Sequence, residues 1–193
     1  MTSAFQSVFA LLILTTTLSF GTQARSYGEG DSEGGGSASG LSNSLTNRVV
    51  RTLTREGEAC QRLEKVYRFD CYRQAYKLSI NVILGNNAYK DAVKALMQVE
   101  RTLQQVVTQN VERTAPVKRR GLQTYRAIKP SAVRSATVQS ERAMRQAQTV
   151  LLRSEAGKRT HYAKIAQAVE SNKVLLRSAA VLRRIWQALV ARA

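Results

Sequence analysis

The chain contains two cysteines, Cys60 and Cys71, which stand 11 positions apart in a segment whose apolar spacing favours helix. In one unbroken helix their Cα atoms would lie about 16 Å apart, because an α-helix rises about 1.5 Å per residue. A disulfide requires Cα atoms roughly 4.4 to 6.8 Å apart. The two cysteines therefore either bridge across a break in the helix or do not bridge each other.

Asp70 offers such a break, because its carboxylate can accept hydrogen bonds from the first backbone N–H groups of a helix that begins at Cys71. Leu63 to Phe69 would then form the turn. The alternative is a continuous helix from Leu41 to Leu84 with free or intermolecular thiols, and an unbroken apolar spacing supports it: Leu45, Val49, Leu53, Cys60, Leu63 and Tyr67. The N-terminal sequence favours the disulfide bridge.

The first 24 residues contain no charged side chain, and the mostly apolar run from Val8 to Phe20 is followed by small residues at Thr22 and Ala24. This pattern predicts that residues 1–24 are a secretory signal peptide and that the protein is periplasmic or secreted. An uncleaved membrane anchor is the alternative, but the run is shorter than the ~20 residues that span a bilayer. Export would place the cysteines in an oxidising compartment, where an even pair in a small protein is usually bridged.

Residues 25–40 are rich in glycine and serine and contain little that could be buried, so we expect a disordered leader. Three acids in this segment, Glu29, Asp31 and Glu33, suggest a weak metal tether as an alternative. That alternative has less support, because flexible acidic segments rarely preorganise metal ligands.

Residues 41–193 are predicted to form a single helical domain. Apolar residues recur at helical spacing, Pro116 and Pro130 are the only prolines, and no pair of strand-like runs flanks a hairpin turn. The expected fold class is all-α: a helical bundle of about four to five antiparallel helices with coiled-coil-like seams, after the disordered N-terminal leader. Gly85 and Asn86 or Asn87 should end one helix and begin the next.

Three segments carry apolar residues in the alternating 3, 4 spacing of a coiled-coil seam. The clearest comprises Tyr89, Ala92, Leu96, Val99, Leu103, Val106 and Asn110. The second, between residues 131 and 154, comprises Val133, Ala136, Ser140, Ala143, Ala147 and Val150. The third, between residues 160 and 190, comprises His161, Ile165, Ala168, Asn172, Leu175, Ala179, Leu182, Trp186 and Leu189. Asn172 is the better candidate for a buried polar residue that fixes helix register, because Asn110 lies near a helix end.

The formal net charge of +17 is concentrated in the second half of the chain. Residues 25–112 carry 12 basic and 10 acidic side chains, whereas residues 113–193 carry 18 basic and 3 acidic ones. A chain this basic attracts anionic polymers or surfaces, such as lipopolysaccharide, phospholipid or nucleic acid. The alternative is a solvated basic surface that aids solubility.

The connector between Pro116 and Pro130 is the densest basic stretch, and it is expected to hold at most a short helix with Leu122, Tyr125 and Ile128 on one side. The candidate residues for binding an anionic partner lie in and around it: Arg113, Lys118, Arg119, Arg120, Arg126 and Lys129.

Four aromatic residues alternate with basic ones around Cys71, namely Tyr67, Phe69, Tyr72 and Tyr76. Exposed rings in this pattern could stack on bases. Their helical spacing favours the other interpretation, in which they pack in the core beside the disulfide.

Enzymatic chemistry has little support in the sequence. His161 is the only histidine, so no Ser/His/Asp or Cys/His set can be assembled, and no ligand cluster has metal-site spacing. We therefore predict a non-enzymatic protein without a metal, cofactor or small-molecule substrate. It would bind an anionic surface or polymer through its cationic C-terminal half. The alternative function is a structural or chaperone-like coiled-coil subunit that binds partner protein helices.

Overall fold

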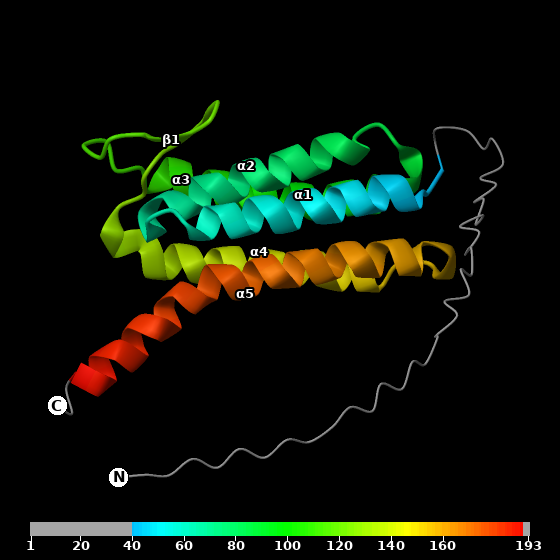
Figure 1. Cartoon of the computed structure of the whole chain (residues 1–193). Coiled ribbons are helices and arrows are strands. Elements are labelled where there is room, and N and C mark those ends of the chain that lie inside the picture. Colours follow the sequence, from blue (N-terminus) through cyan, green and yellow to red (C-terminus); the bar gives the residue numbers. More distant parts are fainter. Residues whose placement is uncertain (1–39, 191–193) are drawn as a thin grey trace, which may run out of the picture. The chain divides into compact units, whose positions relative to one another are not determined.

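The computed structural model describes residues 40–190, with side chains as far as Arg177. The predicted signal peptide and leader therefore lie outside the described residues, as do the side chains at the end of the third seam. Five α-helices and one small hairpin make up most of the described part (Figure 1): α1 Asn43–Gln61, α2 Lys65–Ile83, α3 Lys90–Gln109, β1 Lys118–Arg120, β2 Gln123–Tyr125, α4 Val133–Leu152 and α5 Arg159–Val190. Short 3-10 turns at Asn87–Tyr89, Pro130–Ala132 and Ala156–Lys158 precede α3, α4 and α5.

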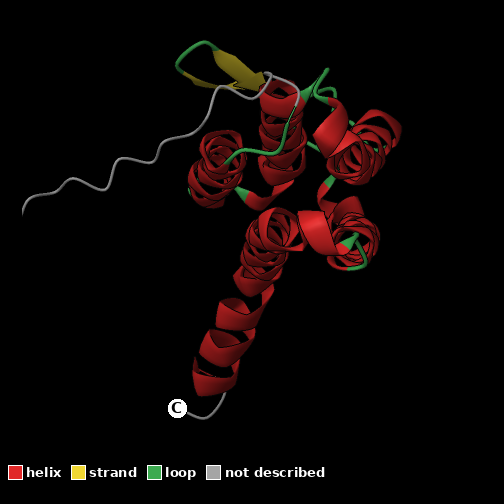
Figure 2. Cartoon of the chain, turned by 90° about the vertical axis from the view of Figure 1, so that its right-hand side faces the viewer, coloured by secondary structure: helices red, strands yellow, loops and turns green. Residues whose placement is uncertain are grey.

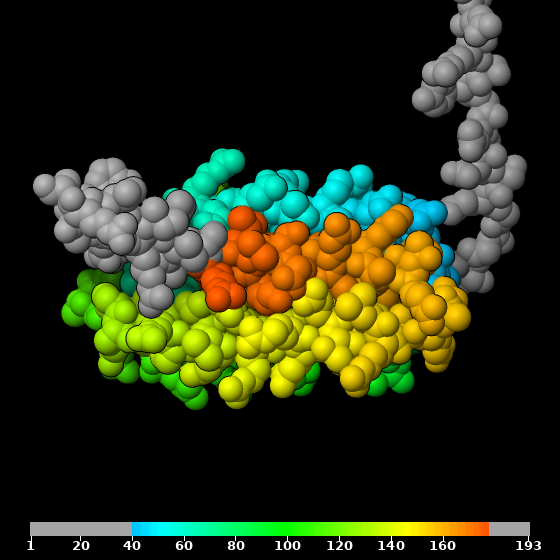
Figure 3. Space-filling model, turned by 90° about the horizontal axis from the view of Figure 1, so that it is seen from below, coloured from blue at the N-terminus to red at the C-terminus, as the bar shows by residue number. Residues whose placement is uncertain are grey.

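The helices form a ring in which each packs against the next and α5 packs against α1 (Figure 2). Helices that follow one another in the chain run antiparallel, and α1 and α5 run in the same direction (Figure 1). A closed ring of five alternating helices must contain one such parallel pair. Figure 3 shows α4 and α5 side by side along one face. The predicted all-α bundle is confirmed.

The predicted disulfide is also confirmed: Cys60 and Cys71 are bonded, and their Cα atoms lie 5.6 Å apart. Because α1 ends at Gln61 and α2 begins at Lys65, the alternative of one continuous helix is wrong. The predicted cap is wrong as well, since Asp70 lies inside α2 and Glu64 occupies the N-cap position without a side-chain cap bond.

Arg68 closes the tight turn between α1 and α2 in place of a carboxylate cap. Its guanidinium donates from Nε to the Leu63 carbonyl at 2.8 Å and from Nη2 to the Gln61 carbonyl at 2.9 Å. These carbonyls have no intrahelical partner at the end of α1. The helix begins at Lys65 and not at Cys71 as predicted, and this earlier start lets Tyr67 and Phe69 lie in the core.

The other predicted helix ends agree with the structure. The sequence offers Ser42 or Ser44 to start the first helix, and the Ser42 hydroxyl caps α1 by accepting from the Leu45 amide at 3.1 Å. Gly85 follows α2 with a φ of +86°, a conformation that glycine adopts without strain. Asn110 is the C-cap of α3, so its polar side chain belongs to a helix end.

The core buries a large set of aromatic side chains. Tyr67, Phe69, Tyr72 and Tyr76 are at most 3% exposed, so the packing interpretation of these residues is confirmed and their rings are not available to stack on bases. Burial raises the pKa of Tyr72 to about 12, partly opposed by hydrogen bonding to Gln61. The apolar members of the clearest seam, from Ala92 to Val106, are fully buried.

The prediction of the second seam is wrong at its C-terminal end, because Val150 is 44% exposed while Met144 and Leu151 are buried. A strict 3, 4 alternation follows a period of 3.5, whereas a straight α-helix has about 3.6 residues per turn. The buried stripe of α4 therefore moves around the helix by one position over its length.

Asn172 is fully buried on α5, as the third seam predicted, and its amide faces α1 and α2. A Cβ atom at Gly57 would lie 1.9 Å from Asn172 Oδ1. Burial raises the pKa of Tyr76, and the nearby Asn172 side chain partly opposes this shift. Neither the Tyr76 hydroxyl nor the Asn172 amide completes a hydrogen bond. The close approach of α5 to α1 therefore requires glycine at position 57.

Gly57→Ala should destabilise the protein by about 1–3 kcal/mol, because the added methyl group overpacks this contact. Alanine at an ordinary helix interior position would instead stabilise by about 0.5–1 kcal/mol. Urea unfolding of the single variant measures the sign. In an Asn172→Ala background the same change should become neutral or stabilising, and a stabilising effect in the wild-type background would refute the close contact.

The connector holds a β-hairpin, which the sequence analysis missed. β1 and β2 pair antiparallel, with Lys118 opposite Tyr125 and Arg120 opposite Gln123. Gly121, with a φ of +58°, and Leu122 form the turn. The expectation that Leu122, Tyr125 and Ile128 share one side is wrong for Leu122, because Leu122 is fully exposed while the other two are buried. Strands of three residues are too short for their periodicity to be recognised.

Candidate anionic-partner site at the hairpin end of the bundle

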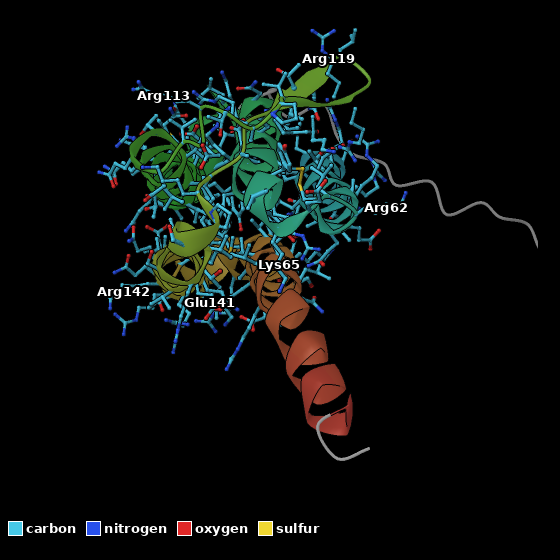
Figure 4. The ribbon with its side chains drawn as sticks, turned by 90° about the vertical axis from the view of Figure 1, so that its left-hand side faces the viewer. Arg62, Lys65, Arg113, Arg119, Glu141 and Arg142 are labelled. Carbon is cyan, nitrogen blue, oxygen red and sulfur yellow. A yellow bond between two sulfur atoms is a disulfide. The ribbon has the colours of Figure 1, made fainter. Side chains whose placement is uncertain are left out.

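The six candidate residues lie on one segment, residues 111–129, which covers the end of the bundle where α3 ends and α2 begins. We call this the hairpin end (Figure 4). The Ile128 amide donates to the Val66 carbonyl at 2.9 Å, and the Tyr67 hydroxyl donates to the Pro116 carbonyl at 2.7 Å. The Lys129 amide donates to the Asn110 carbonyl at 2.8 Å. These bonds fix the segment to α2 and α3.

Asp70 anchors the hairpin to α2. Its side chain is 2% exposed and accepts from Arg73 Nε at 2.7 Å and from the Arg126 backbone amide at 2.9 Å. One turn further along α2, Gln74 Nε2 donates to the Thr124 carbonyl at 2.7 Å. A buried carboxylate with these partners is satisfied by both charge and hydrogen bonding, so β2 is held against the helix.

Three of the six candidate cations face carboxylates of the bundle. Lys118 Nζ lies 3.0 Å from Glu64, Arg120 Nη2 lies 2.5 Å from Glu56, and Arg126 Nε lies 3.8 Å from Asp70. The hydrogen bond to Glu64 raises the pKa of Lys118, whose ammonium also sits 5.6 Å from the centre of the Tyr67 ring. These three cations fasten the hairpin. Their charge is partly balanced, because Glu56 also pairs with Arg55 and Asp70 also pairs with Arg73.

The other three, Arg113, Arg119 and Lys129, are exposed and form no ion pair with any acidic group in the described part of the chain. Figure 4 shows the Arg113 and Arg119 side chains pointing outward from the protein. Arg113 and Lys129 line a surface hollow of about 400 Å³ together with Gln109 and Glu112. Hydrogen bonds from Thr114 lower the pKa of Glu112, so this hollow also contains one stable negative charge.

Arg62 is a further cation that the sequence analysis did not include in the site. It lies in the turn between α1 and α2, is exposed, and likewise has no acidic partner among the described residues (Figure 4). The ion pairs from the hairpin to Glu56 and Glu64 bring residues 111–129 to this turn. Arg62 could not be assigned to the site from the sequence, because only the fold brings it to the same end of the bundle as residues 111–129.

His161 has a structural partner. Its Nδ1 lies 2.7 Å from the Thr46 hydroxyl, which also lies 2.7 Å from the Tyr89 hydroxyl. This network joins the start of α5 to α1 and to the turn before α3, so His161 has a structural role near the start of α5. Among the described residues, no group of three or more histidine, cysteine or acidic side chains is placed to hold a metal ion.

None of the described helices combines the length and the apolar character needed to cross a membrane. Comparison of the chain with protein-family models, with curated proteins and with solved structures finds no match.

Proposed function

We propose that this is an exported, non-enzymatic protein that binds an anionic envelope surface or polymer through the hairpin end of its bundle. The observation that carries the proposal is a set of exposed cations, without an ion pair among the described residues, that two separate parts of the chain place around this end of the bundle: Arg62, Arg113, Arg119 and Lys129. Cations that form no ion pair keep most of their attraction for an external anion, although Glu112 offsets part of the charge of Lys129.

Periplasmic or secreted localisation is part of the proposal. The signal-like sequence motivates it, and a disulfide is compatible with an oxidising compartment.

The alternative, a coiled-coil subunit for partner helices, draws less support. The apolar seam of α3, the clearest of the three seams that motivated it, is fully buried against the chain's own helices. A seam that is already occupied offers no apolar surface to a second chain without opening the bundle.

Binding of the purified protein to anionic vesicles, lipopolysaccharide and duplex DNA should therefore weaken steeply with salt. If about four cations each displace a counterion, a DNA complex should lose roughly a hundredfold in affinity between about 50 and 200 mM salt. Fluorescence anisotropy and vesicle sedimentation across a salt series measure this slope. An absence of binding to all three at the lowest salt would reject the proposal, and salt-insensitive binding would favour a hydrophobic partner interface.

A further inference from the structure

The tip of the hairpin presents an apolar side chain to water. Leu122 has a relative exposure of 104%, the highest among the large hydrophobic residues of the described part, and Val117, next to β1, is 54% exposed. Figure 2 shows the hairpin projecting beyond the helices. A leucine at such a point contributes nothing to the core.

The hairpin is anchored to the bundle on both sides of its tip. Asp70 and Gln74 of α2 bind β2, while Glu56 and Glu64 bind the two ends of β1. Strands that are already anchored lose less conformational freedom on binding than a free loop would, and this favours a contact made by few residues.

Arg119 flanks the apolar tip, and other exposed cations lie around the same end of the bundle, with Arg113 and Arg62 on different sides of it (Figure 4). Arg119 lies on β1 three residues before Leu122, and Lys129 lies at the hairpin end as well. A membrane surface combines anionic headgroups with hydrocarbon directly beneath them, and a small apolar group together with several cations is a recognised basis for interfacial binding. A DNA backbone has no apolar layer, and single-stranded bases stack on aromatic rings, whereas Leu122 is aliphatic.

We propose that the hairpin inserts Leu122 into the interfacial region of an anionic phospholipid bilayer while Arg119 and the neighbouring cations bind lipid phosphates. This inference rests on the proposed function and assigns its partner. Phospholipid fits better than lipopolysaccharide, because a two-residue tip reaches past a phospholipid headgroup but not past a saccharide layer.

Leu122→Ser should weaken binding to vesicles of mixed phosphatidylglycerol and phosphatidylcholine by about tenfold to a hundredfold, the effect of losing a buried leucine side chain. Leu84→Ser is the matched control, because Leu84 is 61% exposed in the turn after α2, away from the hairpin. It should leave vesicle binding unchanged. Circular dichroism of both variants checks that the fold is intact.

A second measurement reports insertion itself. Trp186 is the only tryptophan, so Leu122→Trp in a Trp186→Phe background places one fluorophore at the tip. Its emission should shift to shorter wavelength on anionic vesicles, and lipids brominated on the acyl chain should quench it.

The outcomes separate the two proposals. Unchanged vesicle binding by Leu122→Ser with no emission shift would overturn the inference and leave electrostatic binding standing. Binding to DNA or lipopolysaccharide but not to vesicles would also overturn the insertion of Leu122 and leave electrostatic binding standing. A wild-type protein that binds none of the three at low salt would overturn both proposals.

Discussion

Replacing both Cys60 and Cys71 by alanine should destabilise the protein by about 3 kcal/mol, because the bond restricts the unfolded chain across a short loop. For a domain of this size the thermal midpoint should fall by roughly 6–12 °C. Thermal unfolding followed by circular dichroism, with and without a reductant, measures the difference. The wild type should respond to the reductant and the double variant should not. Two free thiols in protein purified without reductant from an oxidising compartment would contradict this account.

Asp70→Ala should cost about 3 kcal/mol, near the lower end of the range for removing one partner of a buried ion pair. The cost is at the lower end because Arg73 can turn toward Glu100, which already lies 3.8 Å from it. Denaturant unfolding measures the loss. The hairpin should also loosen, so amide hydrogen exchange of residues 118–126 should accelerate more than exchange in α3.

Asp91→Ala is the matched control for this change. Asp91 pairs with Lys158 at 3.4 Å, but its side chain is 47% exposed, so the expected cost is below about 1 kcal/mol. If the two aspartate variants were equally stable and the hairpin amides exchanged as in the wild type, Asp70 would not be the anchor of the hairpin.

Helical periodicity was sufficient to predict the class of fold and most of the core. The seam residues of α3, Ala92, Leu96, Val99, Leu103 and Val106, repeat at this spacing over several turns, and all are buried. The disulfide could be predicted because a continuous helix cannot bring Cys60 and Cys71 together. The position of the turn could not be predicted. Arg68 closes it through hydrogen bonds to backbone carbonyls, which every residue has, so no sequence motif marks the turn.

The site was less predictable, because its charges are sorted by tertiary contacts. Lys118, Arg119 and Arg120 look equivalent in the sequence, yet the first and last pair with Glu64 and Glu56 while Arg119 does not. The acids that make this distinction lie more than 50 positions earlier in the chain. Arg62 joins the same end of the bundle for the same reason.

We expect binding to depend on where the unpaired cations lie and not on the total charge of the protein. Changing Arg113, Arg119 and Lys129 together to glutamine removes three charges without breaking an ion pair in the described residues. The matched control removes three charges that are exposed and unpaired there at the opposite end of the bundle: Lys90, Lys94 and Arg159 (Figure 1). Both variants thus carry the same net charge.

Vesicle sedimentation of the two triple variants at low salt is the most direct test. Each cation near an anionic membrane contributes about 1 kcal/mol, so the hairpin-end variant should bind roughly a hundredfold more weakly than the wild type and show a shallower salt dependence. The control variant should bind within a few-fold of the wild type. Equal losses in the two variants would show that binding follows net charge alone and would contradict a site at the hairpin end.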